Sequence, residues 1–265
     1  MTNHCFTLAY NLPSEVEKVT KLLYELNPIT TFKHLIVDLG FPLEKGDRIP
    51  KDIEMAKLFN SSKLKDIATK YGSDYARMPN IGVSQNWTQV YEYLKPLDSD
   101  ILIGCDPDEH PKKKGWVRAM GQVIREKNLA LCSLMMVDHV PLIAKMPHGE
   151  HNVAGHRIYY VANSSLNWAL IGVSGKFLNL IKEIPYPLEA PIYGWIEAML
   201  YPSMTYHGMN WCILADYMVE HTDYQHGHPG TSSLLREWKN QIVYKVSEGQ
   251  MLFDEFLVMK REGTL

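Results

Sequence analysis

Two patterns are missing from this sequence: the cysteine spacing of a protein stabilised by zinc or disulfides, and the excess of basic residues typical of a nucleic-acid-binding protein. Its four cysteines are widely spaced and form no Cys-x-x-Cys pair, which argues against a zinc knuckle and a disulfide framework. Basic residues do not outnumber acidic ones, 27 against 30, and the formal net charge is −3. No global basic field therefore exists to attract nucleic acid or an anionic membrane, so a partner of either kind would need a local patch.

Long apolar runs, internal repeats and low-complexity tracts are also absent. No apolar span reaches the length that crosses a membrane, and the first residues lack a basic region followed by a long apolar one. We therefore expect a cytoplasmic protein without an integral membrane segment, and peripheral membrane contact stays open. The 265 residues, 46% of them hydrophobic, can bury a sizeable core.

The sequence does contain short β-type runs that alternate with helical patterns, which is typical of strands joined by crossover helices in a largely parallel sheet. Strands are expected at residues 5–10, 32–40, 100–105, 129–137, 156–163 and 210–221. Helices are expected at residues 14–26, 52–59, 63–72, 84–94, 112–128 and 175–184. Residues 146–157 have the small and polar composition of a mobile loop. We predict an α/β domain over residues 1–229 and a helical C-terminal extension over 230–265 packed on it.

A pair of aspartates directly follows the strand expected at residues 100–105. In "CDPDEHP", Asp106 and Asp108 are separated by one proline, so both side chains can reach the same side of a turn. Mg²⁺ and Mn²⁺ prefer such oxygen ligands and commonly complete their shell with water and substrate phosphates. Asp and Pro are equally good residues for an ordinary solvated turn, and the spacing alone does not separate the two interpretations.

Three further signals precede this pair in a fixed order. "LAYN" ends the first strand, "LIVDLG" ends the second, and the turn in "RMPNIGVSQNWTQV" leads into a helix. They supply Tyr10 with Asn11, Asp38 with Gly40, and Asn80 with Gly82. The four signals together resemble the GT-A fold nucleotide-sugar glycosyltransferases, in particular the large inverting family with a short D-x-D motif, over residues 4 to about 221.

The resemblance implies a GT-A type, Rossmann-like fold with a mixed, mostly parallel central sheet. It also implies a metal-dependent transfer of a sugar, with inversion, from a nucleoside-diphosphate sugar to an acceptor hydroxyl, and a UDP-sugar is favoured. The nucleotide-sugar-binding positions implied are Ala9, Tyr10, Asn11, Asp38, Asn80, Gly82 and Asp106. Asp106 would face the ribose or a metal-bound water, and Asp108 would bind Mn²⁺ or Mg²⁺ directly. Asp38 could instead cap local amides, and Asn80 could be an ordinary turn residue.

The catalytic base of the family is an acidic residue that begins a helix and is followed three positions later by Leu. "IYGWIEAML" offers Glu197 with Leu200, and Glu197 would take the proton of the acceptor hydroxyl. Ile196 stands where the family usually has a second acid, and a first-turn glutamate favoured by the helix dipole is the other interpretation. The adjacent Trp195 is a candidate contact to the acceptor or donor.

Many GT-A enzymes complete the metal shell with a late histidine, and His221 in "ADYMVEHTDYQHGHPG" is the candidate here. The same stretch has two other interpretations, a zinc site formed with His226 and His228, or an exposed turn without ligands. Two other functional classes therefore stay open, a non-catalytic nucleotide-sugar-binding protein and a zinc-dependent hydrolase. The acceptor is not defined by the sequence, and a saccharide, a lipid-linked sugar, a protein or a modified nucleic-acid base all remain possible.

Overall fold

The computed structural model of the chain describes residues 1–9, 13–39, 61–79, 83–137, 148–161, 169–184 and 196–221. The strands in these ranges are β1 (Asn3–Ala9), β2 (Lys33–Asp38), β3 (Asp74–Arg77), β4 (Ile101–Gly104), β5 (Glu109–Pro111), β6 (Leu131–Met136), β7 (His148–Val153), β8 (His156–Val161), β9 (Ala169–Ser174) and β10 (Trp211–His221). The helices are α1 (Pro13–Leu26), α3 (Ser61–Tyr71), α4 (Val83–Leu94), α5 (Trp116–Lys127), α7 (Gly175–Ile181) and α8 (Ile196–Tyr206), with a short 3-10 turn, η1 (Ile29–Thr31).

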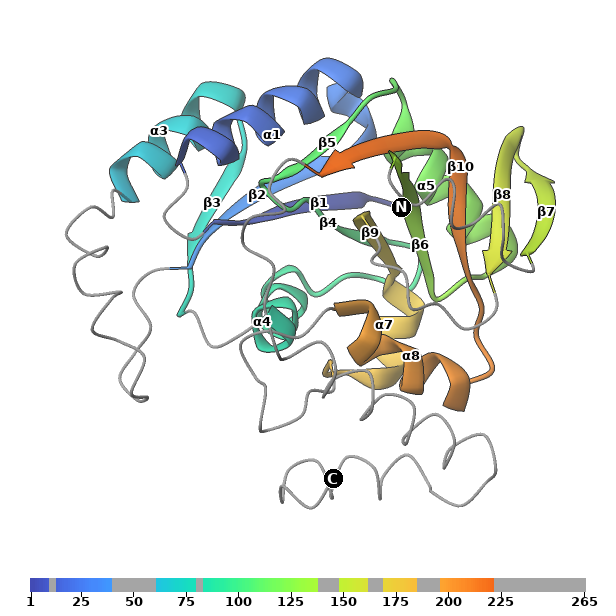
Figure 1. Cartoon of the computed structure of the whole chain (residues 1–265). Helices are drawn as coiled ribbons and strands as arrows, with labels where there is room; N and C mark the ends of the chain where they lie inside the picture. The colour runs from blue at the N-terminus through green and yellow to red at the C-terminus, as the bar shows by residue number, and fades with distance from the viewer. Residues whose placement is uncertain are drawn as a thin grey trace, which may run out of the picture.

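The strands form one mixed ten-stranded sheet in the order β3-β2-β1-β4-β9-β6-β10-β8-β7, and β5 pairs with β10 outside this path (Figure 1). The first four strands in this order are mutually parallel, with Ala9 beside Asp38 and Phe6 beside Gly104. Their carboxyl ends therefore reach the same edge of the sheet. The predicted α/β class, with a mixed sheet between helices, is confirmed.

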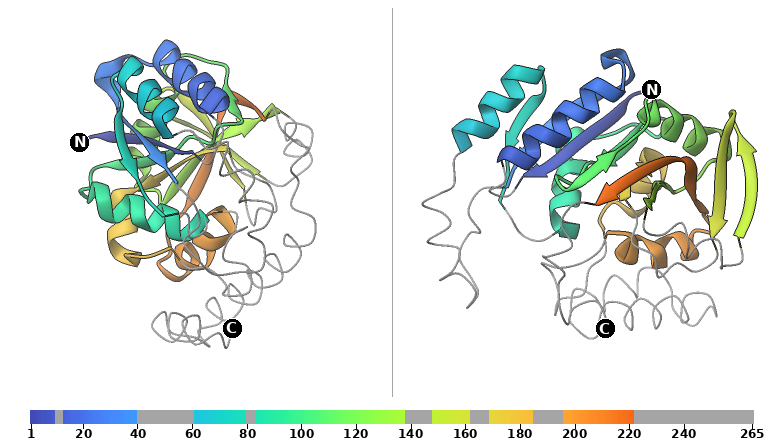
Figure 2. Two further views of the ribbon diagram at one scale, coloured as in Figure 1. Left: turned by 90° about the vertical axis from the view of Figure 1, so that its left-hand side faces the viewer. Right: turned by 45° about the horizontal axis from the view of Figure 1, so that its top comes forward.

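Alternating side chains of the strands pack against two layers of helices. Phe6 and Leu102 face the layer of α4, α7 and α8, whereas Cys5 and Ile103 face α1 and α5. Figures 1 and 2 show these layers on opposite faces of the sheet, with α3 beside α1. Helix α1 begins at Pro13, a residue suited to the first helical position, and buries one face at helical spacing. The period-2 and period-3.6 patterns of the sequence thus specify this part of the sheet and its cover.

The prediction of a loop over residues 146–157 is wrong for the part of this segment that the structure describes, because residues 148–161 form the β7–β8 hairpin. Its two-residue turn is Ala154-Gly155, and both residues have positive φ, as tight hairpin turns require. The polar sequence of β7 suggested a loop, but the strand is held by pairing with β8. Strands β3, β5 and β9 were not predicted either. The helix expected at 52–59 and the segment 230–265 lie outside the described residues.

Strand β10 changes partners along its length. Leu214 pairs with Leu134 of β6 and Met218 pairs with Met135, so three residues of β10 bulge out between neighbouring residues of β6. Beyond the bulge, β10 runs antiparallel to β5, with His221 opposite Glu109. A bulge bends its strand, and Figure 1 shows β10 (orange) curving toward β5. The bulge therefore carries the end of β10 to the segment that follows β4.

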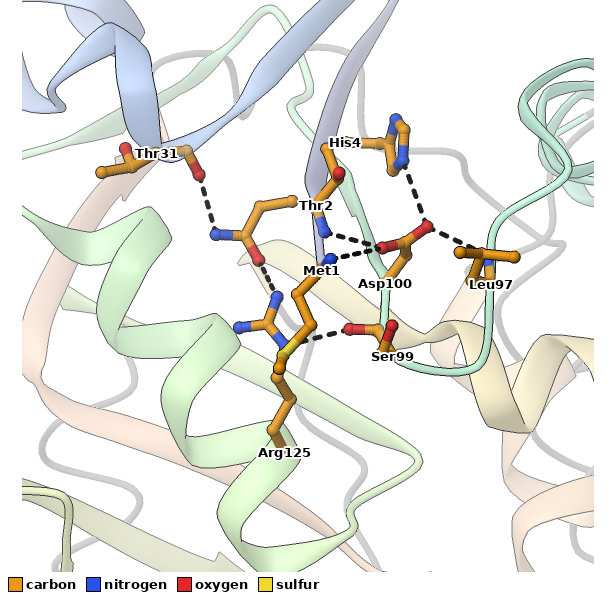
Figure 3. A network of polar contacts seen from close by, with 9 residues as sticks. Met1, Thr2, His4, Thr31, Leu97, Ser99, Asp100 and Arg125 are labelled. Carbon is orange, nitrogen blue, oxygen red and sulfur yellow. Dashed lines mark hydrogen bonds and ion pairs between the residues drawn. The ribbon is translucent and has the colours of Figure 1, made fainter.

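The amino end of the parallel strands is tied together by a polar network around Asp100, which immediately precedes β4 (Figure 3). Its carboxylate accepts the N–H of Thr2 at 2.6 Å and the N–H of Leu97 at 3.0 Å, and His4 Nε2 lies 3.6 Å away. Burial alone would raise the pKa of Asp100, but these donors outweigh it and hold the pKa below its usual value. Arg125 continues the network, because its Nε donates to the carbonyl of Ser99.

Within the described ranges, every helix is too short or too polar to cross a membrane.

Candidate active site

The site predicted from the sequence lies at the edge where β1, β2 and β4 reach their carboxyl ends. Ala9 and Asp38 are register partners, and the N–H of Leu39 donates to the carbonyl of Ala9 at 3.0 Å. The N–H of Cys105 donates to the carbonyl of Phe6 at 2.8 Å, so the chain leaves the sheet at Asp106. Ala9 and Asp38 are the last residues of β1 and β2, and Asp106 lies just beyond the adjacent parallel strand β4, at the edge where open α/β sheets bind ligands.

The two aspartates of the D-x-D motif occupy one β-turn. The N–H of Glu109 donates to the carbonyl of Asp106 at 3.1 Å, which closes a four-residue turn with Pro107 second and Asp108 third. Proline favours the second position of such turns, and Asp favours the first. Asp106 is exposed and Asp108 is half-buried. The turn geometry expected for an ordinary acidic turn is therefore present, and it also carries both carboxylates at the site edge.

Glu109, which directly follows the motif, was missed by sequence reasoning. Its side chain is only 5% exposed, and Oε2 accepts the N–H of Leu170 at 2.8 Å. Burial raises the pKa of Glu109 well above its usual value, and the negative charges of Asp106 and Asp108 raise it further. Its signal in the sequence is weak, because an acidic residue after a turn is ordinary. A buried carboxyl with a raised pKa therefore lies next to the two aspartates.

The donor of that hydrogen bond lies in an irregular part of β9. Cys132 of β6 pairs with Gly172 and Leu134 pairs with Ala169, so Leu170 and Ile171 together face the single residue Ser133. Leu170 is buried and has φ of 46°, a left-handed conformation that is uncommon for a bulky residue. The bulge turns the Leu170 N–H toward Glu109.

A tryptophan packs beneath the last residue of β4. Trp87, on α4, lies against Gly104, and a Cβ added at that glycine would overlap the indole ring. The ring also meets Phe6 edge to face, with centroids 4.6 Å apart. Trp87 is a core residue, since it is buried. Gly104 is the residue that lets the helix layer approach the strand just before the D-x-D turn.

Asp38 is fully buried at the end of β2, and its Oδ2 accepts the hydroxyl of Tyr75 from β3. Burial, together with this hydrogen bond, raises the pKa of Tyr75 to about 12. The phenol therefore stays protonated at neutral pH and continues to donate. Tyr75 had no recognisable signal in the sequence, because β3 itself was not predicted. The nucleotide-binding role of Asp38 stays a prediction.

The pairing of β10 with β5 brings the predicted late histidine to the D-x-D segment. His221 is the last residue of β10, and its backbone lies opposite Glu109, the residue after Asp108. Glu197 is the second residue of α8, which is consistent with an acidic residue that begins a helix, and Leu200 is buried in the core. Tyr10, Asn11, Asn80, Gly82, Trp195, His226 and His228 lie outside the described residues.

Among the residues that the structure describes, no three His, Cys, Asp or Glu side chains are arranged as a ready-made metal cluster. The turn nevertheless fits a hard divalent cation, because it presents two carboxylates on one short segment. Such a cation is commonly held by one or two carboxylates, and water and phosphate oxygens fill the rest of its shell. The donor set around Asp108 therefore suits Mg²⁺ or Mn²⁺ held jointly with a diphosphate.

Comparison with known proteins identifies the fold. No protein-family model and no curated protein matches the sequence. Among solved structures, Staphylococcus aureus TarS 1-349 in complex with UDP-GlcNAc is similar with a TM-score of 0.55 and 13% identity, covering 91% of this chain and 66% of that one. A mycobacterial protein is similar with a TM-score of 0.55 and 12% identity, covering 93% of this chain and 75% of that one.

A third match is TarS 1-349 in complex with UDP, with a TM-score of 0.52 and 12% identity, covering 83% of this chain and 60% of that one. The chain thus spans less than two thirds of the TarS structures that it matches. TarS is a GT-A glycosyltransferase, and the protein described here has the GT-A fold. At these identities the likeness concerns the fold alone.

Proposed function

We propose that the protein is a nucleotide-sugar glycosyltransferase that transfers a sugar from a nucleoside-diphosphate sugar, a UDP-sugar by preference, to an acceptor hydroxyl with inversion. The observation that carries the proposal is the Asp106–Glu109 turn, which follows β4 at the carboxyl edge of a GT-A sheet and has His221 in register beside it. The similar TarS structures contain UDP-GlcNAc or UDP, which supports this donor class.

In this proposal Asp108 and His221 hold Mn²⁺ or Mg²⁺, and Asp106 faces the ribose or a water on the cation. When bound, the cation supplies neutralisation of the charge that develops on the leaving diphosphate. Ala9 and Asp38, with Tyr10, Asn11, Asn80 and Gly82, form the nucleotide pocket. A buried Asp38 held by Tyr75 would contribute a rigid wall to that pocket.

Glu197 is the proposed base, which would accept the proton of the acceptor hydroxyl as that oxygen attacks the anomeric carbon. Trp195, two residues earlier, is the proposed contact to the acceptor or donor sugar. Lack of the family's second acidic residue before Glu197 keeps a non-catalytic nucleotide-sugar-binding protein as the second candidate. The two candidates differ in one observable, the release of sugar from the donor.

The test is nucleotide binding measured by calorimetry with UDP and a panel of UDP-sugars, with and without Mn²⁺. Asp108→Asn should weaken the Mn²⁺-dependent affinity about 100-fold or more, because it removes a charged ligand without changing the shape of the turn. The matched control is Asp66→Asn, which changes an exposed aspartate on α3 and should bind like the wild type.

Sugar release from the donor panel is then measured with wild type and Glu197→Gln. Turnover that falls about 10²- to 10⁴-fold in the variant is the expected result for a general base. Binding without release by the wild type across the panel would favour the non-catalytic candidate. Absence of nucleotide binding, or equal binding by Asp108→Asn, would contradict the proposal as a whole.

A further inference from the structure

We propose that Glu109 is a positioning residue, which locks the Asp106–Glu109 turn to β9 by holding the N–H of Leu170 and so presents Asp106 and Asp108 to a cation. This inference rests on the proposed function, because the use of the lock is to pre-organise the D-x-D carboxylates. It concerns two residues, Glu109 and Leu170, to which the D-x-D motif itself assigns no role.

The first support is the location of the hydrogen bond. Glu109 is the fourth residue of the turn and the first residue of β5, so its side chain acts on the turn and on the β5–β10 pair together. Its partner is 61 positions away in the sequence, on a strand in the centre of the sheet. The bond therefore connects the turn to a central strand of the sheet.

The second support is the backbone of Leu170. A non-glycine residue at positive φ costs about 1–3 kcal/mol and persists only where the surroundings determine it. In a regular ladder the Leu170 N–H would be used by β-pairing, but the bulge between β6 and β9 frees it. A strained residue beside a candidate site is an indication of function rather than of chance packing.

The third support is that the Leu170 N–H and the Glu109 carboxyl each remove the free-energy cost of burying the other without a hydrogen-bond partner. A buried N–H without an acceptor costs about 1–3 kcal/mol, and a buried carboxyl without a partner is also costly. Leu170 and Glu109 are both buried, and their hydrogen bond of 2.8 Å satisfies both groups. Replacing either group alone leaves the other unsatisfied, so the turn would lose its fixed distance from β9.

The test compares Glu109→Gln with Glu109→Met. Both replacements have nearly the length of glutamate, but only glutamine keeps an oxygen that can accept the Leu170 N–H. Hydrogen exchange of the Leu170 amide, measured without ligand, should stay near the wild-type rate in Glu109→Gln and become at least about 10-fold faster in Glu109→Met. Equal exchange in wild type and Glu109→Met would overturn the lock whatever the protein binds.

The second readout is the Mn²⁺-dependent affinity for UDP. It should fall about 10- to 100-fold in Glu109→Met, as for other residues that orient metal ligands, and should be rescued to within about threefold by Glu109→Gln. Asp100→Asn is the matched control, because it alters an equally buried carboxyl at the opposite end of β4 and should leave this affinity unchanged. Wild-type affinity in Glu109→Met would overturn the positioning role alone. If the wild type does not bind UDP, or binds it no more tightly than Asp108→Asn does, the proposed function is overturned, and the positioning role with it.

Discussion

Asp100 and Glu109 are equally buried, each 5% exposed, and they lie just before and shortly after the same strand, β4. Their surroundings nevertheless shift their pKa values in opposite directions. Asp100 accepts two backbone N–H groups near His4, and its pKa is lowered, whereas burial and two neighbouring aspartates raise the pKa of Glu109. The amino end of the sheet therefore satisfies its buried carboxylate with donors, while the carboxyl end gathers acidic groups.

The difference agrees with the proposal that the carboxyl end binds a ligand, whereas the amino end contributes stability. At the amino end the carboxylate of Asp100 accepts two backbone N–H groups and lies near His4, so protein groups stabilise its charge (Figure 3). At the carboxyl end three carboxyl groups lie on one four-residue turn, which is unfavourable for the protein alone and favourable once a cation is present. Violations of local stability rules are expected at functional sites.

The largest expected effects come from the two glycines that allow close packing at these ends. A Cβ at Gly175 would overlap the backbone carbonyl oxygen of Leu97 and lie 2.9 Å from that of Asp100, so Gly175→Ala should lower the free energy of unfolding by about 3 kcal/mol. Gly104→Ala meets the side chain of Trp87, which can shift more easily, and should cost about 2 kcal/mol. Urea denaturation measures both.

These two glycine variants should also differ in ligand binding, since only Gly104 adjoins the D-x-D turn. Gly104→Ala should weaken Mn²⁺-dependent UDP binding, whereas Gly175→Ala, measured below its unfolding transition, should not. Weakened UDP binding in Gly175→Ala but not in Gly104→Ala would contradict the proposal that the amino end contributes stability and the carboxyl end binds the ligand.

A smaller effect, of opposite sign at the two ends, is expected in the pH dependence of unfolding measured in EDTA. The lowered pKa of Asp100 gives stability that is present above the unfolded value of 3.8 and lost as the pH falls through the folded value, so Asp100→Asn should be least stable relative to wild type at neutral pH. The raised pKa of Glu109 costs stability as the pH rises above the unfolded value of 4.5. The stability of Glu109→Gln relative to wild type should therefore increase with rising pH.

Each pKa unit of difference corresponds to about 1.4 kcal/mol, so urea denaturation should show the Asp100 trend as the pH falls below the unfolded value of 3.8 and the Glu109 trend as the pH rises above 4.5. Burial also lowers the pKa of His34 to about 3, which makes the protein lose stability as the pH falls below 6.5. That loss is common to wild type and variants and cancels in the differences. Trends of the same sign for the two variants would contradict the comparison.

The smallest expected effect concerns Arg125, which donates to the carbonyl of Ser99 and, from Nη2, to Asn3 Oδ1 at 2.6 Å. Arg125→Lys keeps the charge but loses one of the two donors, and should lower the free energy of unfolding by about 1 kcal/mol. UDP affinity should not change, because the residue belongs to the amino end. A change in UDP affinity with unchanged stability would contradict the assignment of Arg125 to the amino end.

The parallel part of the fold could be predicted from the sequence because its signals are local. Strands β1, β2 and β4 are buried apolar runs, and the helices between them have regular apolar spacing. By contrast β5 is three residues long and ends in proline, and β7 is polar, so both depend on partners elsewhere in the chain. Strand β3 is hard to predict for the same reason, because it has only four residues of mixed polarity.

The same distinction applies to the candidate site. Asp106 and Asp108 could be predicted because one short motif contains both, and Asp38 because it ends an apolar strand. The contact from Glu109 to Leu170 spans 61 positions and depends on a bulge and a positive φ, neither of which has a local signature. The register of His221 likewise follows from the pairing of distant strands.

The bulge in β10 makes the site sensitive to chain length as well as to residue identity. Residues 215–217 lie between Leu214 and Met218, which both pair with β6, and the stretch beyond them, residues 219–221, also pairs with β5. Shortening residues 215–217 by one residue, with the core register and a three-residue bulge both kept, would draw Met218 into the bulge and move the next residue of the chain, Thr222, into the position opposite Glu109. An insertion of one residue would put Glu220 there instead. The number of residues in this part of the chain thus selects a histidine, rather than a threonine or a glutamate, to stand beside the acidic turn.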